Sequence, residues 1–433
     1  MGGPTLRGPI AASVAGKTVE MATLILLATL VPRALCPSDY GRFAVALTIV
    51  TLGTLALTLG GPALMTRYVP GTPPDEQIPL ARALGVRLAR EAGLQICVLG
   101  GIAALVVVAF GVRVPWPDAI AVSAGLILNV GATIALLVAL GLGRAAAWSA
   151  RYPIQNLVLI AFVLALHPVA GSAGALAAIT LSALMAVVFA AVVSAPVLVA
   201  DLPAPLLVPG GAVRFGRLQT VGAALTQVTH RGGVVVVALL AGSQRETGYA
   251  ALAVGIAVGV SYAIIQIFTV SLPAVLTSDA EPERELTRIA EGVLAVVVPV
   301  ALIAALLLDR LVPAVFGSDY AGASPAFGPA VALVVLAPLT ALVANIASVR
   351  LRPEIATLSG AVSLVVFVVV ALVAVGRSGA TGAISATLAG VAAGTLVSVA
   401  MLRGDVTSPG VRTRTVVLSF AAAVAVLVVA AVA

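Results

Sequence analysis

The sequence predicts an all-α polytopic membrane protein with thirteen membrane-spanning helices. Hydrophobic residues make up 61% of its 433 residues, whereas only 9% are charged, and most charges fall at regular breaks between long apolar runs. An apolar run of about 20 residues spans the hydrocarbon core of a bilayer as a helix. The predicted spans are residues 10–31, 41–66, 92–112, 118–142, 153–169, 173–199, 217–241, 248–277, 292–316, 325–349, 354–375, 379–402 and 415–433.

The breaks between these spans carry the residues that end membrane helices. Each contains proline, glycine or charged residues, which mark turns and loops in water rather than in lipid. In chain order they are residues 32–40, 67–91, 113–117, 143–152, 170–172, 200–216, 242–247, 278–291, 317–324, 350–353, 376–378 and 403–414. None is long enough to hold a separate soluble domain.

A proline-rich stretch at residues 203–209 indicates a joint between two halves of six spans each. We therefore predict an N-terminal lobe (1–200), a cytoplasmic linker (201–216), a second lobe (217–403) and an extra C-terminal span (404–433). An even number of spans in each half means that both halves enter the membrane from the same side. The lobes are accordingly expected to be parallel repeats.

The distribution of basic residues predicts the orientation in the membrane. Sixteen arginines fall on the side of the N-terminus and six on the other, so the positive-inside rule puts the N-terminus in the cytoplasm and the chain in the cell membrane. The first group is Arg7, Arg67, Arg82, Arg87, Arg90, Arg144, Arg151, Arg214, Arg217, Arg284, Arg288, Arg350, Arg352, Arg403, Arg412 and Arg414. The net charge of +7 is spread singly over these loops, which does not favour a nucleic-acid partner.

Three short motifs resemble a known family. They are the turn at residues 37–43 (PSDYGRF) with the following Leu59-Gly60 and Arg67-Tyr68, the turn Gly248-Tyr249-Ala250, and the stretch at residues 315–323 (VFGSDYAGA). These motifs are similar to turns in polysaccharide-biosynthesis (O-antigen-type) flippases of the multidrug/oligosaccharidyl-lipid/polysaccharide exporter superfamily. The resemblance implies two six-helix lobes around a central cavity, a lipid-diphosphate-linked saccharide as cargo, and alternating access without ATP hydrolysis.

Arg231 is the first candidate site residue, because it lies in the middle of the seventh span. A midplane arginine costs about 2.5 kcal/mol or more unless it faces water or a partner. Gln227 precedes it by four residues and shares its helical face. A guanidinium suits phosphate oxygens, so we expect Arg231 and Gln227 to bind an anionic headgroup. The alternative is a structural arginine that pairs with a buried carboxylate such as Glu20. The adjacent His230 is expected to bond to a neighbouring helix, and a proton-sensing role is the alternative.

Lys17 and Glu20 are the other charges predicted inside the membrane, on one face of the first span. One interpretation is a self-paired structural bridge, since Lys17 lies near enough to the cytoplasmic face to reach water. The functional interpretation is that Lys17 attracts the cargo phosphate while Glu20 titrates or binds a cation that drives transport. We expect no cofactor and no metal.

Taken together, the residues favour a flippase for a lipid-linked saccharide over two alternatives. A cation-coupled multidrug antiporter of the same superfamily needs acidic cavity residues, whereas here the basic Lys17 and Arg231 outnumber Glu20. A membrane sugar-lipid ligase or polymerase needs a large outer loop, which the sequence lacks, so we expect a protein that is not an enzyme. The expected partners are the lipid-linked saccharide, membrane lipid and a coupling H⁺ or Na⁺. The chain is expected to be a monomer.

Overall fold

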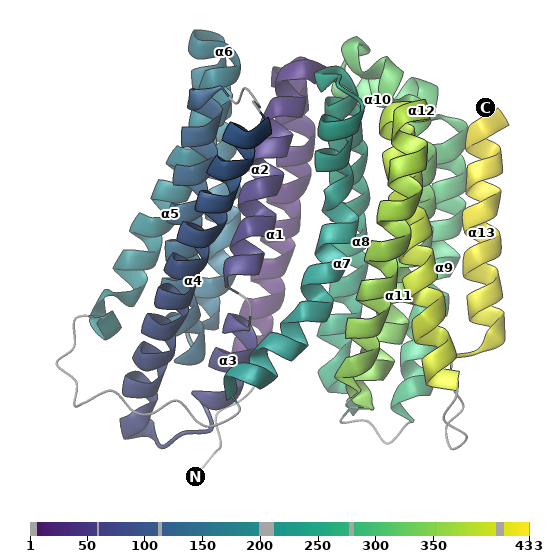
Figure 1. Cartoon of the computed structure of the whole chain (residues 1–433). Coiled ribbons are helices and arrows are strands. Elements are labelled where there is room, and N and C mark those ends of the chain that lie inside the picture. Colours follow the sequence, from purple (N-terminus) through teal and green to yellow (C-terminus); the bar gives the residue numbers. More distant parts are fainter. Residues whose placement is uncertain are drawn as a thin grey trace. The chain divides into compact units, whose positions relative to one another are not determined.

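The computed structural model describes residues 7–58, 60–110, 115–198, 212–276, 281–350, 352–403 and 411–432, and these residues form helices without strands (Figure 1). The helices are α1 (Arg7–Ala34), α2 (Pro37–Leu57), α3 (Gly61–Tyr68), α4 (Pro74–Phe110), α5 (Trp116–Gly141), α6 (Ala145–Leu198), α7 (Ala212–Leu240), α8 (Gln244–Leu276), α9 (Pro282–Leu306), α10 (Leu308–Phe316), the 3-10 helix η1 (Ser318–Ala323), α11 (Ser324–Val349), α12 (Pro353–Arg403) and α13 (Thr413–Val432). The predicted all-α fold is confirmed.

Helix α6 contains two spans, because the chain reverses at Gly171. This glycine has φ 57° and ψ −141°, which interrupts the helix. The Nη1 of Arg144, the residue immediately before α6, donates to the carbonyl of Val193 near the end of α6, at 2.7 Å. In a straight helix these two residues would be about 73 Å apart. The two halves of α6 therefore run antiparallel, as the separate predicted spans 153–169 and 173–199 require.

Helix α12 has the same organisation. The backbone leaves the helical region at Ser378 and at Gly379, which has a φ of 50°. A Cβ atom on Gly390 would lie 2.6 Å from the carbonyl oxygen of Ser363, and one on Gly394 would lie 2.6 Å from that of Ser359. The two halves of α12 thus approach each other backbone to backbone, and glycine permits this distance. They correspond to the predicted spans 354–375 and 379–402.

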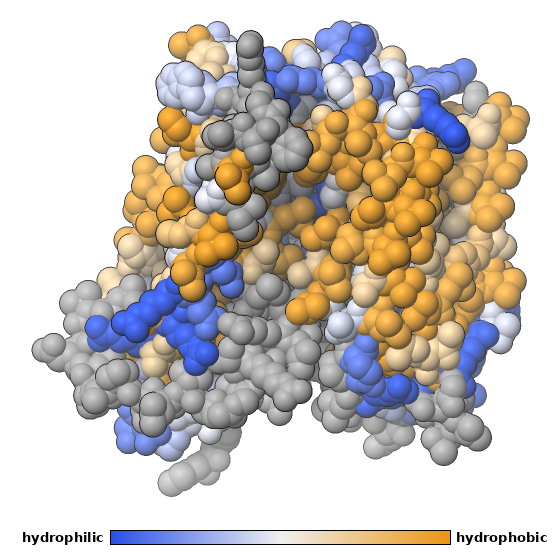
Figure 2. All heavy atoms as spheres, viewed as in Figure 1, coloured by the Kyte–Doolittle hydropathy of each residue, from blue (hydrophilic) through white to orange (hydrophobic). Residues whose placement is uncertain are grey.

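Eight helices in the described part of the chain are long and apolar enough to cross a membrane, and two of them are the double spans in α6 and α12. The chain is therefore a multi-pass membrane protein. On the face drawn in Figure 2, hydrophobic side chains cover the middle of the helices of the second half, and hydrophilic residues gather at their ends. The extra C-terminal helix is present as α13, whereas residues 404–410 before it lie outside the described residues.

The chain divides into two compact units. Unit 1 comprises Met1–Leu27 and Ala46–Val221, and unit 2 comprises Ala28–Val45 and Gly222–Ala433. The end of α1 and the start of α2 are therefore grouped with the second half of the sequence. The lobe boundaries given above stay a prediction, and residues 201–211 of the predicted linker lie outside the described residues.

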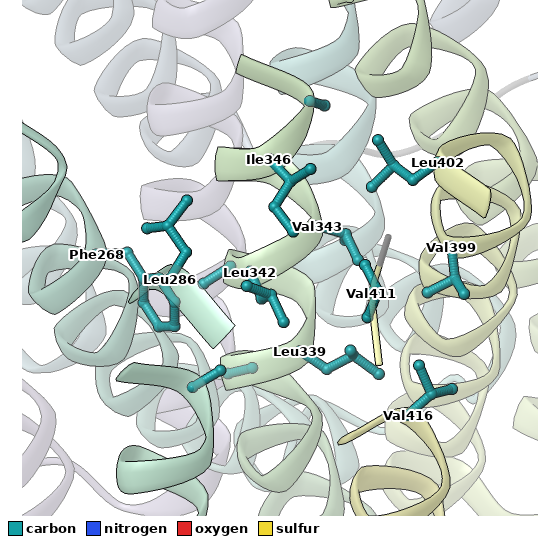
Figure 3. Close-up of a cluster of buried hydrophobic side chains, with 14 of the residues drawn as sticks. Phe268, Leu286, Leu339, Leu342, Val343, Ile346, Val399, Leu402, Val411 and Val416 are labelled. Carbon is teal, nitrogen blue, oxygen red and sulfur yellow. The ribbon is translucent and has the colours of Figure 1, made fainter. Parts of the chain in front are cut away.

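Each unit has its own apolar core. In unit 1, side chains from α2, α3, α4 and α5 form one cluster, which includes Met65, Leu84 and Leu137. In unit 2, α11 packs against α8, α9, α12 and α13. Figure 3 shows the resulting cluster, in which Phe268, Leu286 and Leu342 lie next to one another. These cores make each unit a stable frame for the polar residues that lie inside it.

Candidate functional site

Glu20 lies on α1 in unit 1 and is only 5% exposed. One turn later, the Thr23 hydroxyl donates to the backbone carbonyl of Glu20 at 2.9 Å. Asn156 of α6 donates its Nδ2 to the hydroxyl of Thr23 at 3.2 Å. Glu20 is thus a buried acid beside a polar contact between α1 and α6. Such an intramembrane acid is a natural candidate for proton or cation binding.

Lys17 has its backbone in the same helix, one turn before Glu20. Its side chain lies outside the described part of the structure. The role expected for Lys17 therefore stays a prediction.

Arg231 and Gln227 lie on α7, within unit 2. The face of α7 that packs on α12 is marked by Gly222 and Gly233, whose added Cβ atoms would meet Ala356 and Thr387. At 100° per residue, Gln227 and Arg231 fall on the opposite side of α7. Gln227 is exposed and Arg231 is half-buried. Both polar side chains therefore face away from α12.

His230 takes a different partner from the one expected. Its Nδ1 lies 2.8 Å from the carbonyl oxygen of Thr226, one turn earlier in the same helix. The hydrogen bond formed at Nδ1 is not the one expected to a neighbouring helix, because its partner belongs to α7 itself. The histidine is thus engaged within α7 itself.

A polar cluster inside unit 1, centred on Arg151, was not expected from the sequence. This arginine was counted among the charges at the membrane edge, yet its side chain is 1% exposed. Its Nη2 donates at 2.8 Å to the Oδ1 of Asn129, which lies in the middle of α5. The guanidinium is therefore buried between helices and is not exposed to water. The available signal was Asn129 and Gln155, two polar residues within apolar spans.

The three turns of the motifs that carry the family resemblance, at residues 37–43, 248–250 and 315–323, meet in unit 2. The ring of Tyr320 in η1 lies 6.3 Å from the rings of both Tyr40 and Tyr249. Gly248 of α8 approaches Pro37 so closely that an added Cβ would lie 2.0 Å from the Pro37 carbonyl oxygen. The motifs therefore form one packed junction, which explains why aromatic and glycine residues recur in each of them.

No group of three or more His, Cys, Asp or Glu residues is placed to hold a metal ion within the ranges that the structure describes. Glu20, whose turn of α1 lies beside the Thr23–Asn156 hydrogen bond, stays a prediction as the ion-coupling residue.

This arrangement of helices is similar to that of solved membrane-transporter structures. One solved structure with this fold is a lipid II flippase, MurJ, in an inward closed conformation. The TM-score is 0.68 at 9% identity, over 97% of this chain and 98% of that one. A second is an inward-facing multidrug-resistance transporter of the MATE family, with a TM-score of 0.56 at 16% identity, over 94% and 98% of the chains.

A third similar structure is an outward-facing MATE transporter, with a TM-score of 0.51 at 15% identity, over 95% of this chain and 96% of that one. No sequence-family description matches the chain, and no curated protein matches it by sequence. The structural similarities therefore establish the fold, and the cargo has to be argued from the residues.

Proposed function

We propose that this protein flips a lipid-diphosphate-linked oligosaccharide or polysaccharide precursor from the cytoplasmic to the outer leaflet by alternating access. The observation that carries the proposal is the fold shared with a lipid II flippase over 97% of the chain. A transporter of that fold with basic residues inside its spans suits an anionic cargo. In this proposal the protein serves polysaccharide or lipopolysaccharide biosynthesis, and its N-terminus lies in the cytoplasm of the cell.

Arg231 is the residue proposed to bind the cargo phosphate, with Gln227 beside it and Lys17 attracting the same charge. Arg231 and Gln227 lie on the side of α7 that faces away from α12. The packing of α7 on α12 therefore does not use their side-chain N–H donors. A guanidinium gives phosphate oxygens short, charge-assisted hydrogen bonds. Binding energy of this kind orients the headgroup while the lipid tails stay in the bilayer.

Glu20 is the residue proposed to couple transport to a cation, H⁺ or Na⁺. It is buried, and the Asn156–Thr23 hydrogen bond holds α6 against its turn of α1. Loading a proton or a sodium ion neutralises the carboxylate and lowers the cost of burying it. A change in the charge of Glu20 therefore biases unit 1 between conformations. The protein is proposed to act as a monomer.

A cation-coupled multidrug antiporter is the second candidate, and the fold shared with MATE transporters supports it. Glu20 would then bind a cationic drug or the coupling ion. The proposal of an anionic cargo is favoured because Arg231 and Lys17 lie within spans and outnumber that acid. A sugar-lipid ligase or polymerase is less well supported, because the predicted outer loops are short.

Transport assays in reconstituted vesicles distinguish the two candidate functions. The purified full-length chain is placed in liposomes with a fluorescent lipid-diphosphate oligosaccharide, and headgroup exposure on the far leaflet is followed by enzymatic labelling. Parallel vesicles carry a cationic dye and a proton or sodium gradient. Flipping of the saccharide lipid without dye efflux supports the flippase. Gradient-driven dye efflux without flipping would instead establish the antiporter.

A further inference from the structure

Arg151 is a buried arginine in unit 1 whose guanidinium contacts neutral groups among the described residues. Its side chain is 1% exposed, six residues into α6. The Nη2 donates to the Oδ1 of Asn129 at 2.8 Å and approaches the backbone carbonyl of the same residue at 3.4 Å. The guanidinium carbon lies 4.9 Å from the ring centre of Tyr152 and 5.9 Å from that of Trp148. These contacts accommodate the cation but do not neutralise it.

Two nitrogens of this guanidinium are buried without a hydrogen-bond partner among the described residues, namely Nε and Nη1. Between them they carry three of the five N–H donors of an arginine. A buried donor with no acceptor is costly, and a buried cation with no counter-charge is costlier still. The favourable way to satisfy all three donors at once is a negatively charged acceptor.

The guanidinium is held in place by a chain of hydrogen bonds. Asn129 donates its Nδ2 to the hydroxyl of Thr54 at 2.9 Å, which fixes the orientation of its amide. Gln155 donates its Nε2 to the same Oδ1 that Arg151 uses, at 3.2 Å. Asn129 thus turns its oxygen toward α6 and anchors one nitrogen of Arg151. The other two guanidinium nitrogens, Nε and Nη1, are thereby held in a fixed position, as a preorganised binding site requires.

We propose that Arg151 binds a compact anion, a halide or a phosphate group, at its Nε and Nη1. Tyr152, whose ring lies against the guanidinium, is 37% exposed, so access to this site is proposed to run past its ring. The anion is either a free ion from solution or the phosphate of a lipid headgroup, since both present the same charge and acceptors. This site is independent of the cargo proposed above.

The test is the thermal unfolding midpoint of the purified full-length chain, measured against anion concentration in a neutral detergent with gluconate as the reference salt. Titrants are sodium chloride, sodium phosphate, and nanodiscs containing phosphatidylglycerol rather than phosphatidylcholine. The midpoint of the wild type is expected to rise and saturate, because a ligand that binds the folded state stabilises it. A response to the salts indicates a free ion, and a response to phosphatidylglycerol alone indicates a headgroup.

Two substitutions assign the response to Arg151. Arg151→Gln is expected to weaken the apparent affinity by about tenfold or more, the value of a lost charge-assisted hydrogen bond. Arg144→Gln is the matched control, since it removes an exposed arginine that immediately precedes the same helix. Its titration is expected to match that of the wild type.

If Arg151→Gln does not fold, Asn129→Asp provides a second test of the anion site. It places a built-in carboxylate beside Nη2, so the protein is expected to be folded and to have lost its response to added anions. A wild type that responds to none of the three titrants overturns the proposal. A full response in Arg151→Gln or Asn129→Asp overturns it equally.

Discussion

In unit 2 the hydroxyl of Tyr320 donates a hydrogen bond of 3.1 Å to the backbone carbonyl of Leu35, one residue beyond the end of α1. The two residues are 285 positions apart in the sequence. Around them, the hydroxyl of Tyr249 donates to the carbonyl of Asp319 at 3.3 Å, and Arg245 donates its Nε to that hydroxyl at 2.6 Å. The three recurring motifs thus join the α1–α2 turn to η1 and α8.

Tyr320→Phe tests the hydrogen bond of this junction separately from its packing. The substitution keeps the ring but leaves the Leu35 carbonyl without its partner, so the free energy of unfolding is expected to fall by about 1 kcal/mol. Tyr320→Ala also removes the buried ring and is expected to cost about 3–5 kcal/mol. Denaturation in detergent measures both. Equal losses for the two variants would contradict the view that ring packing dominates.

Gly248→Ala tests the close approach of α8 to the α1–α2 turn. The added Cβ would lie 2.0 Å from the carbonyl oxygen of Pro37, which is backbone and cannot move away freely. We expect loss of most folded protein, measured as the monodisperse fraction on size exclusion. Gly259→Ala, also on α8, is the control, because nothing lies within 4 Å of its added Cβ. A well-folded Gly248→Ala protein would show that the approach is not required.

Glu20→Gln tests the proposed coupling role. The amide has nearly the same shape as the carboxyl but neither ionises nor accepts a proton near neutral pH. Gradient-stimulated transport is therefore expected to fall by about tenfold or more, while binding of the saccharide lipid is retained. Transport with and without a proton or sodium gradient measures this, with Glu354→Gln as an exposed control. Unchanged gradient dependence would remove Glu20 from coupling.

The spans were predictable because each one is a long apolar run bounded by polar residues. The breaks at residues 170–172 and 376–378 were found although each is only three residues long, since glycine and polar residues stand there. Helix limits were less predictable. The span predicted at 92–112 belongs to α4, which begins at Pro74, because the acids Asp75 and Glu76 favour a helix start well before the apolar run.

The burial of Arg151 and the meeting of the three tyrosine motifs depend on tertiary packing, which the sequence alone did not reveal. A count of basic residues treats an arginine near the end of a span as solvated, which is right for Arg144 and wrong for Arg151. The difference is whether a polar partner lies within reach on a neighbouring helix, as Asn129 does. Likewise, the motifs at Tyr40, Tyr249 and Tyr320 were recognised separately, while their meeting in unit 2 depends on contacts between distant segments.

The most direct test of the proposed function is the flipping rate of Arg231→Ala in reconstituted vesicles that carry a lipid-diphosphate oligosaccharide. We expect a rate about 100-fold below wild type, equivalent to about 2.7 kcal/mol, with unchanged insertion and thermal stability. Arg231→Lys should keep part of the activity, and Arg288→Ala, which removes an exposed arginine of the same unit, should keep all of it. Wild-type flipping by Arg231→Ala would contradict the assignment of an anionic cargo to this residue.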